Sequence, residues 1–308
     1  MAIIILPIMV IGHLFLGSYY PISTVENIAQ ENLWELDFHL LPYVLSQILV
    51  FVFICANAFL LNFVFNRLEF NNRYIYLPTV LYVLLLFLFP FSLYFNEYLI
   101  VHTFFILSFY HLLQINQNDD ARNNLFLSGL FLGVATTFSP PVAIFLVIIL
   151  LSLFSIRPFS LREHLLPLTG FVFPFLWVLF VNFDWWRDLL AFTPDNELII
   201  SNSLVLVGYI TVALFILLSI KVILEKRAIS SVVFKRISSI TLFTVIVFLG
   251  LAILMAIVHD TSIYFVLSTA TLPFILPYPY IIVKKRHMFA INLFYLLIIL
   301  SICKFFYT

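Results

Sequence analysis

Charged residues are scarce in this 308-residue chain. Asp, Glu, Lys and Arg together make up 10% of it, whereas a soluble domain carries about 25%. Hydrophobic residues make up 64%, and the mean hydropathy is +1.14. This composition excludes an ordinary soluble domain. The net charge is zero and the basic residues fall in short connections, so the sequence predicts no nucleic-acid partner.

Cysteine and processing signals are nearly absent as well. Cys55 and Cys303 both fall inside apolar segments without metal-type spacing, so we expect them to fill space between packed helices. No basic stretch or small-residue cleavage site follows Met1, so there is no sign of a cleavable signal peptide. No Lys or Arg occurs before Arg67. A missing basic N-terminal tail and a misassigned start both stay open as explanations.

The charges that are present alternate in sign from one gap between apolar segments to the next. Thirteen of the fifteen Lys and Arg residues fall in one set of gaps, and ten of the fifteen Asp and Glu residues fall in the other. Arg187 and Lys304 are the two basic exceptions. Basic loops stay in the cytoplasm. The pattern therefore predicts a multi-pass protein of the bacterial cytoplasmic (inner) membrane with its N-terminus in the cytoplasm.

The apolar segments predict an all-α protein, a single transmembrane helical domain over residues 1–308. A membrane helix needs about 20 apolar residues, and on that template we predict about eleven transmembrane helices. Residues 138–141, Phe-Ser-Pro-Pro, predict a tight break. The charge pattern favours two full crossings around it, and a re-entrant hairpin is the alternative. The predicted spans are 2–16, 41–65, 74–94, 98–113, 124–138, 141–156, 165–182, 198–221, 237–258, 262–283 and 288–306.

The middles of these predicted helices contain no Asp, Glu, Lys or Arg. Proton- and sodium-coupled transporters generally carry such residues, so the sequence argues against a coupled transporter, though not against a flippase. His13, His102 and His111 lie within spans, and we expect hydrogen-bonded packing rather than metal ligation from them. Three asparagines of the second span are expected to bond between helices: Asn57, Asn62 and Asn66.

Carboxylates gather in the predicted outer loops. The first of these, residues 18–40, carries Glu31, Glu35 and Asp37, and its apolar residues recur at near-helical spacing. Such a segment is typical of an amphipathic helix on the membrane surface. One interpretation is a solvated acidic loop. The other is that Glu35, Asp37 or Glu31 points into an outer cavity as a general base or metal ligand.

Two further outer loops carry isolated charges. Glu97 stands alone in Phe95-Asn-Glu-Tyr98, where a structural and a chemical role both stay open. Arg187 lies beside Trp185 and Trp186 in the segment 182–188. Arg187 either makes a surface ion pair with a neighbouring Asp or holds a lipid phosphate. The two tryptophans and Trp34 belong to an aromatic belt or stack on a substrate. No zinc motif, catalytic triad or glycine-rich phosphate loop appears in the sequence.

Several short motifs follow one another in a recognisable order between residues 65 and 180. A span ends in Asn66-Arg67, the next ends in Leu88-Phe-Pro90, and Asn96-Glu97-Tyr98 follows. After them come segments 127–135 (Leu-Ser-Gly-Leu-Phe-Leu-Gly-Val-Ala), 139–141 (Ser-Pro-Pro), 165–170 (Leu-Leu-Pro-Leu-Thr-Gly) and 174–177 (Pro-Phe-Leu-Trp). This order resembles the core of the GT-C superfamily, the membrane glycosyltransferases that use polyprenyl-phosphate sugar donors. Gly129 and Gly133 also suit any close helix pair. As a whole, the chain also resembles a family of inner-membrane proteins from the Bacteroidota.

The GT-C resemblance implies a catalytic acid in the first outer loop. Asp37 or Glu35 would then be the base that activates the acceptor, and Glu97 would assist it or bind a divalent metal, the one cofactor implied. Arg187, with Trp185 and Trp186, would contact the donor phosphate.

Three functional hypotheses follow from the sequence. The first is a GT-C-like glycosyltransferase that faces the periplasm and uses a polyprenyl-phosphate-linked sugar. The second is a non-catalytic subunit of a larger inner-membrane or envelope export complex, favoured by the short loops and the aromatic surface. The third is a flippase for lipids or lipid-linked sugars. The expected partners are membrane lipids, a lipid-linked sugar and, for the second hypothesis, other proteins.

Overall fold

The structure is a computed structural model that describes residues 2–19, 33–34, 36, 38–71, 73–88, 90–115, 121–156, 160–181, 203–258, 263–282 and 287–303. Every regular element in these ranges is a helix, which confirms the all-α prediction. The α-helices are α1 (Ala2–Tyr19), α2 (Tyr43–Arg67), α3 (Leu77–Phe87), α4 (Glu97–Gln114), α5 (Arg122–Phe138), α6 (Ile144–Ile156), α7 (Leu161–Val181), α9 (Ser203–Ile229), α10 (Val232–Val258), α11 (Ile263–Ser268), α12 (Tyr278–Ile282) and α13 (His287–Cys303). Short 3-10 turns are η2 (Phe38–Leu40), η3 (Pro90–Leu93), η4 (Pro140–Ala143) and η6 (Leu272–Phe274).

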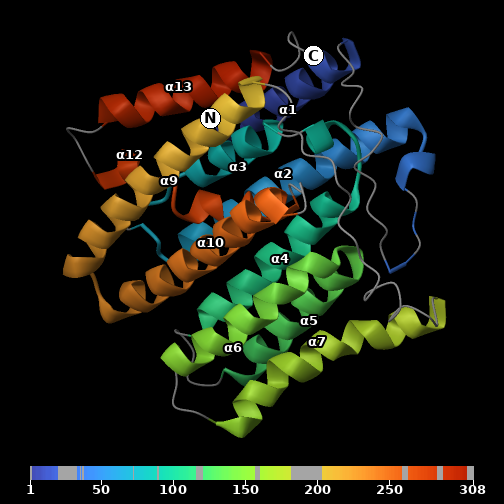
Figure 1. The fold of residues 1–308 in the computed structure, drawn as a ribbon, viewed down its shortest axis with the longest axis vertical. Coiled ribbons are helices and arrows are strands. Elements are labelled where there is room, and N and C mark those ends of the chain that lie inside the picture. Colours follow the sequence, from blue (N-terminus) through green and yellow to red (C-terminus); the bar gives the residue numbers. More distant parts are fainter. Residues whose placement is uncertain are drawn as a thin grey trace.

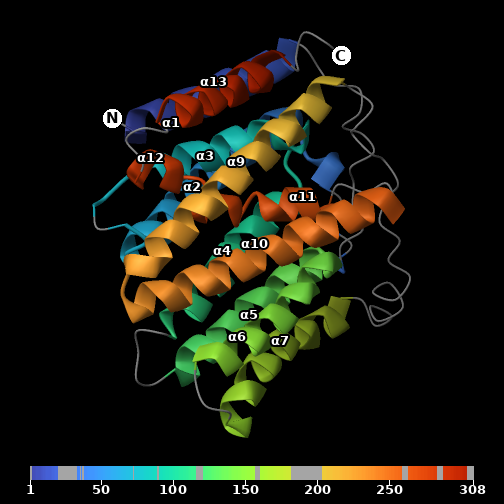
Figure 2. The same cartoon turned by 60° about the vertical axis from the view of Figure 1, so that its left-hand side comes forward.

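The long helices lie side by side and run roughly parallel or antiparallel to one another (Figures 1 and 2). Helices α1 and α13 form one edge of the bundle, and α7 forms the opposite edge. At one end, on the left in Figure 1, α9 ends and α10 begins; we call this the inner end. At the other end, on the right, α4 begins and α5 and α7 end; we call this the outer end.

Three helices in the described part of the chain are long and apolar enough to cross a membrane, by length and composition: Tyr43–Arg67, Leu161–Phe180 and Val232–Met255. Shorter apolar helices accompany them at Leu6–Gly17, Leu77–Phe87, Pro140–Phe154 and Ile291–Cys303. These lengths suit a membrane protein. The number of about eleven crossings stays a prediction.

Helices α5 and α7 pack with their backbones in direct contact. A Cβ atom added to Gly129 or Gly133 of α5 would collide with the carbonyl oxygen of Pro167 or Phe171 on α7. A Cβ atom on Gly170 of α7 would collide in the same way with the carbonyl oxygen of Phe126. Small residues at such an interface let two membrane helices approach closely. The prediction that Gly129 and Gly133 serve a close helix pair is confirmed.

The break predicted at residues 138–141 is present. Helix α5 ends at Phe138, Ser139 is extended with φ −146° and ψ 99°, and the turn η4 leads into α6. The third predicted span, residues 74–94, is wrong as one helix. Helix α3 covers only Leu77–Phe87, and η3 follows from Pro90. Proline lacks the N–H that a continuing helix needs.

The tenth predicted span, residues 262–283, is also wrong as one helix. It consists of α11, turns around η6, and α12, and we call residues 263–282 the broken segment. Pro273 and Pro277 cause the break, because each removes a backbone donor and clashes with the preceding turn, whereas Pro279 lies in the first turn of α12, where proline is tolerated. The backbone instead closes tighter turns, such as Thr271 N–H to Ser268 O at 2.9 Å. Residues 266–279 are buried, and the segment contacts α3, α4, α9, α10 and α13.

Candidate functional site

Glu97 occupies the first turn of α4 at the outer end and is only 3% exposed. A carboxylate in the first helical turn is stabilised by the helix dipole, which is positive at that end. A buried charged group must be paired or hydrogen-bonded. Burial therefore separates Glu97 from the solvated acidic residues of an ordinary outer loop.

Residues 93–96, which lead into Glu97, are fixed by the first turns of α2. Phe95 N–H donates to Ser46 Oγ at 3.0 Å, and Gln47 Nε2 donates to Leu93 O at 2.8 Å. Asn96, the residue before α4, uses its side-chain Nδ2 to donate to Tyr94 O at 3.0 Å. These bonds satisfy backbone groups that a loop would otherwise leave unpaired. They hold the beginning of α4 against the beginning of α2.

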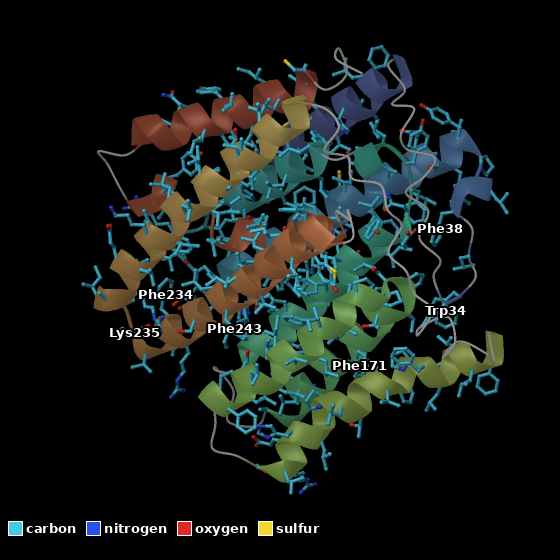
Figure 3. All side chains as sticks on the ribbon, viewed as in Figure 1. Trp34, Phe38, Phe171, Phe234, Lys235 and Phe243 are labelled. Carbon is cyan, nitrogen blue, oxygen red and sulfur yellow. The ribbon has the colours of Figure 1, made fainter. Side chains whose placement is uncertain are left out.

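The described residues of the first outer loop dock at the same end of the bundle. Leu33 N–H donates to Thr137 O at 3.0 Å, and Trp34 Nε1 donates to Thr137 Oγ1 at 2.9 Å. Further along, the Phe38 ring meets the Phe95 ring edge-on, with centroids 5.3 Å apart. Figure 3 shows Trp34 and Phe38 together on the outer side of the molecule, away from Phe234 and Lys235. The loop is thus anchored to the end of α5 and to the residues before Glu97.

Of the predicted site residues, the structure describes only Glu97. Glu35 and Asp37, the candidate bases, lie outside the described residues, although Trp34 and Phe38 on either side of them are described. The candidate phosphate contacts also lie outside the described residues: Arg187, Trp185 and Trp186. Trp34, considered for stacking on a substrate, uses its indole N–H to bind Thr137 and lies near the Phe138 ring.

A divalent metal at Glu97 would need further oxygen or nitrogen ligands. The described residues contain no group of three His, Cys, Asp or Glu side chains able to hold a metal ion. They bring one carboxylate, Glu97, to the outer end. We therefore derive no chemical step through a metal.

A second polar cluster lies in the interior of the bundle, around His102 of α4. His102 is fully buried, and its Nε2 lies 3.1 Å from Val266 O of the broken segment. A carbonyl can only accept, so Nε2 carries the proton and donates, and Nδ1 accepts from Tyr82 Oη at 3.0 Å. The hydrogen-bonded role predicted for His102 is confirmed. The sequence did not indicate that its partner would be the backbone at a helix break.

The other predicted intramembrane polar residues have mixed outcomes. Asn57 Nδ2 donates to Leu99 O at 2.8 Å, and Asn57 Oδ1 accepts from Thr103 at 2.6 Å, so Asn57 joins α2 to α4 as predicted. Asn66 does not join two helices; its side chain bonds to Asn62 O and to both backbone groups of Ile75, pinning the loop before α3. Asn62 reaches Tyr74 Oη, in the same loop, at 3.5 Å.

The two remaining histidines also pack as predicted. His13 Nε2 lies 2.9 Å from Ser92 Oγ, and the His13 ring stacks on the Phe87 ring with centroids 3.8 Å apart. His111 Nδ1 lies 3.1 Å from Asn124 Oδ1.

Reasoning from the sequence missed a cluster at the inner end, where Lys226, Phe70 and Tyr278 meet. Pro273 and Pro277 of the broken segment were the signal that could have predicted a break there and so a buried position for Tyr278. Comparison of the chain with protein-family models, with curated proteins and with solved structures found no match.

Proposed function

We propose that this chain is a multi-pass protein of the bacterial inner membrane, with its N-terminus in the cytoplasm and about eleven crossings. The sidedness of the charges supports this orientation. In this proposal the inner end, where Lys226 and Lys235 lie, faces the cytoplasm. The outer end, where Glu97 lies, faces the periplasm.

At the outer end, the proposed activity is GT-C-like transfer of a sugar from a polyprenyl-phosphate donor. Asp37 or Glu35 takes the proton of the acceptor hydroxyl. The acceptor oxygen then bonds to the anomeric carbon as the bond to the lipid phosphate breaks. Glu97 assists this base, and Arg187, with Trp185 and Trp186, holds the donor phosphate.

The observation that carries this proposal is the burial of Glu97. A carboxylate that is 3% exposed at the end of a membrane bundle is expensive to keep, and such residues are usually functional. The bonds from Ser46 and Gln47 hold the residues before Glu97 in place. Trp34 and Phe38, which flank the candidate bases in the sequence, dock at the same end of the molecule as Glu97.

Substitution of Glu97 by Gln tests the proposal. We expect Glu97→Gln, like Asp37→Asn, to abolish complementation of a clean deletion while the protein stays at normal abundance in the membrane. The matched control is Glu225→Gln, which removes an exposed carboxylate of α9. Native mass spectrometry of the extracted protein should also find a bound polyprenyl phosphate or its sugar. Full complementation by the Glu97→Gln, Asp37→Asn double variant would exclude the enzyme.

A flippase for lipid-linked sugars is the second candidate, favoured by the broken segment beside His102. Discontinuous helices at mid-membrane depth are typical of transporters. A flippase should tolerate Glu97→Gln but lose function on Asn57→Ala or His102→Ala. A stoichiometric protein partner with only bulk phospholipid bound would support the non-catalytic subunit instead.

A further inference from the structure

Four elements converge at the inner end on one backbone carbonyl. Phe70 O accepts from Lys226 Nζ of α9 at 3.0 Å and from Tyr278 Oη of α12 at 2.9 Å. Phe234, near the start of α10, contacts both donors through its ring. Phe70 itself follows Glu69, which has the left-handed φ of 56° that turns the chain after α2. The carbonyl is thus presented by a tight turn to groups 156 and 208 residues away along the chain.

The Lys226 ammonium lies between two aromatic rings. Its Nζ is 4.5 Å from the centroid of Phe234 and 5.0 Å from that of Tyr278. The two rings meet edge-on at 69°, with centroids 6.2 Å apart. Each ring face attracts a cation by about 0.5–2 kcal/mol.

Within the described part of the chain, Lys226 uses only part of its hydrogen-bonding capacity. An ammonium has three N–H donors, and the Phe70 carbonyl takes one of them. No carboxylate of the described residues lies within 4.0 Å of Nζ. The side chain is half-buried, and burial lowers the pKa of Lys226, because water is partly removed from around the ammonium. A bound anion would supply the missing charge and acceptors.

The surroundings favour an anion that belongs to a lipid. Arg227, Lys235 and Arg236 add positive charge at this end, and the cytoplasmic leaflet attracts such clusters through its anionic lipids. The turn between α9 and α10 exposes apolar side chains: Ile229 is 90% exposed and Val232 is 64% exposed. Apolar side chains among basic ones are typical of segments that enter the boundary between headgroups and acyl chains. Lys226 lies one turn of α9 before Ile229, beside this boundary.

We propose that Lys226, whose ammonium lies between Phe234 and Tyr278, is the centre of an inner-face site for the phosphate of an anionic lipid. The site lies at the opposite end of the bundle from Glu97 and needs only the membrane orientation proposed above. Its ligand is a phosphate carried by an inner-leaflet lipid. Lysine binds phosphate as a compact point charge.

Native mass spectrometry with phosphatidylglycerol as the probe and phosphatidylethanolamine as the zwitterionic reference tests the site. We expect Lys226→Gln to weaken binding of the first phosphatidylglycerol about ten- to a hundredfold, the effect of losing a hydrogen bond to a charged group. The matched control is Lys221→Gln, which makes the same charge change at an exposed position of α9. Lys221→Gln should keep that binding. Equal losses in the two variants would show general attraction and overturn the proposal.

Two further arms separate a lipid site from its alternatives. Millimolar inorganic phosphate should not displace the lipid; if it does so as well as phosphatidylglycerol itself, the site takes a free anion and the lipid assignment is wrong. Lys226→Arg keeps the charge and should keep lipid binding even if Lys226→Gln lowers the melting temperature. Loss of lipid binding in a stable Lys226→Arg protein would show that a positive charge at this position is not enough, and would overturn the proposal that Lys226 binds phosphate as a point charge. Glu97→Gln should bind phosphatidylglycerol as the wild type does. Loss of the proposed activity and loss of this lipid site can therefore be told apart.

Discussion

Substitution of Gly129 by Ala should destabilise the protein, because α5 and α7 leave no room for a Cβ atom. The added carbon would collide with the carbonyl oxygen of Pro167, and would also lie 2.7 Å from its carbonyl carbon and 2.8 Å from its Cα. All three are backbone atoms, so no side chain can rotate away. The two helices would have to separate along their contact.

The expected magnitude follows from two opposing terms. Overfilling a packed interface costs about 1–3 kcal/mol. Replacing a glycine inside a helix by alanine stabilises the helix by about 1 kcal/mol. Gly250 of α10 provides the control, since a Cβ there would meet nothing within 4 Å. Gly250→Ala carries the helical term alone, so the difference between the two variants isolates the contact at about 1–3 kcal/mol.

The assay is reversible unfolding in mixed micelles titrated with sodium dodecyl sulfate and followed by tryptophan fluorescence. Wild type, Gly129→Ala and Gly250→Ala should give transitions of equal steepness with shifted midpoints. Gly12→Ala in α1 is a second control, because nothing lies within 4 Å of a Cβ at that position either. If Gly129→Ala is as stable as Gly250→Ala, the close approach of α5 and α7 is refuted.

Two further predictions concern the buried polar contacts. Tyr82→Phe should destabilise the fold by about 1–2 kcal/mol, because it removes the hydrogen bond that Tyr82 Oη donates to His102 Nδ1. Tyr295→Phe, at an exposed position, should leave the stability unchanged. Hydrogen exchange at residues 266–271 should rise in Tyr82→Phe only, and equal exchange in the two variants would contradict the role of His102 at the break. For Lys226, burial lowers the pKa in the folded state below the ordinary value of 10.5, which the unfolded state keeps. At a pH between the folded and unfolded pKa values, the unfolded state therefore binds more protons, and the free energy of unfolding rises with pH. The stability of the wild type relative to Lys226→Met should therefore increase as the pH approaches 10.5. The difference in melting temperature between the two proteins measures this, and Lys221→Met is the control. A difference that does not depend on pH would contradict the burial of the ammonium.

Particular residues show how far the sequence could predict the fold. The helical class, most helix positions and the break after Phe138 follow from apolar length and proline chemistry. Gly129 and Gly133 indicated a close pair of helices, and the pair proved to be α5 and α7. The spans at 74–94 and 262–283 failed because total hydrophobicity was weighed above Pro90, Pro273 and Pro277. A buried broken segment is as apolar as a membrane helix, so composition alone does not separate the two.

The candidate site was less predictable than the fold. Glu97 was singled out by its isolation in a short loop, and its burial came only from the packing of α2 and α4 around it. From the sequence, Lys226 was indistinguishable from the other basic residues of a predicted cytoplasmic loop. Its aromatic neighbours come from α10 and α12, and the carbonyl that it binds comes from the turn after α2.

By itself, the sequence determined that the chain is helical and apolar and that its charges are sorted by sign, because these depend on composition and local order. Tertiary structure decided which residues meet: His102 with Val266, Lys226 and Tyr278 with Phe70. The physical reason is that these helices are apolar on nearly every side. The small polar residues that do turn inward, such as Ser238, Thr241 and Thr244 of α10, bond to carbonyls of their own helix, so only the packing of the whole bundle selects the partners.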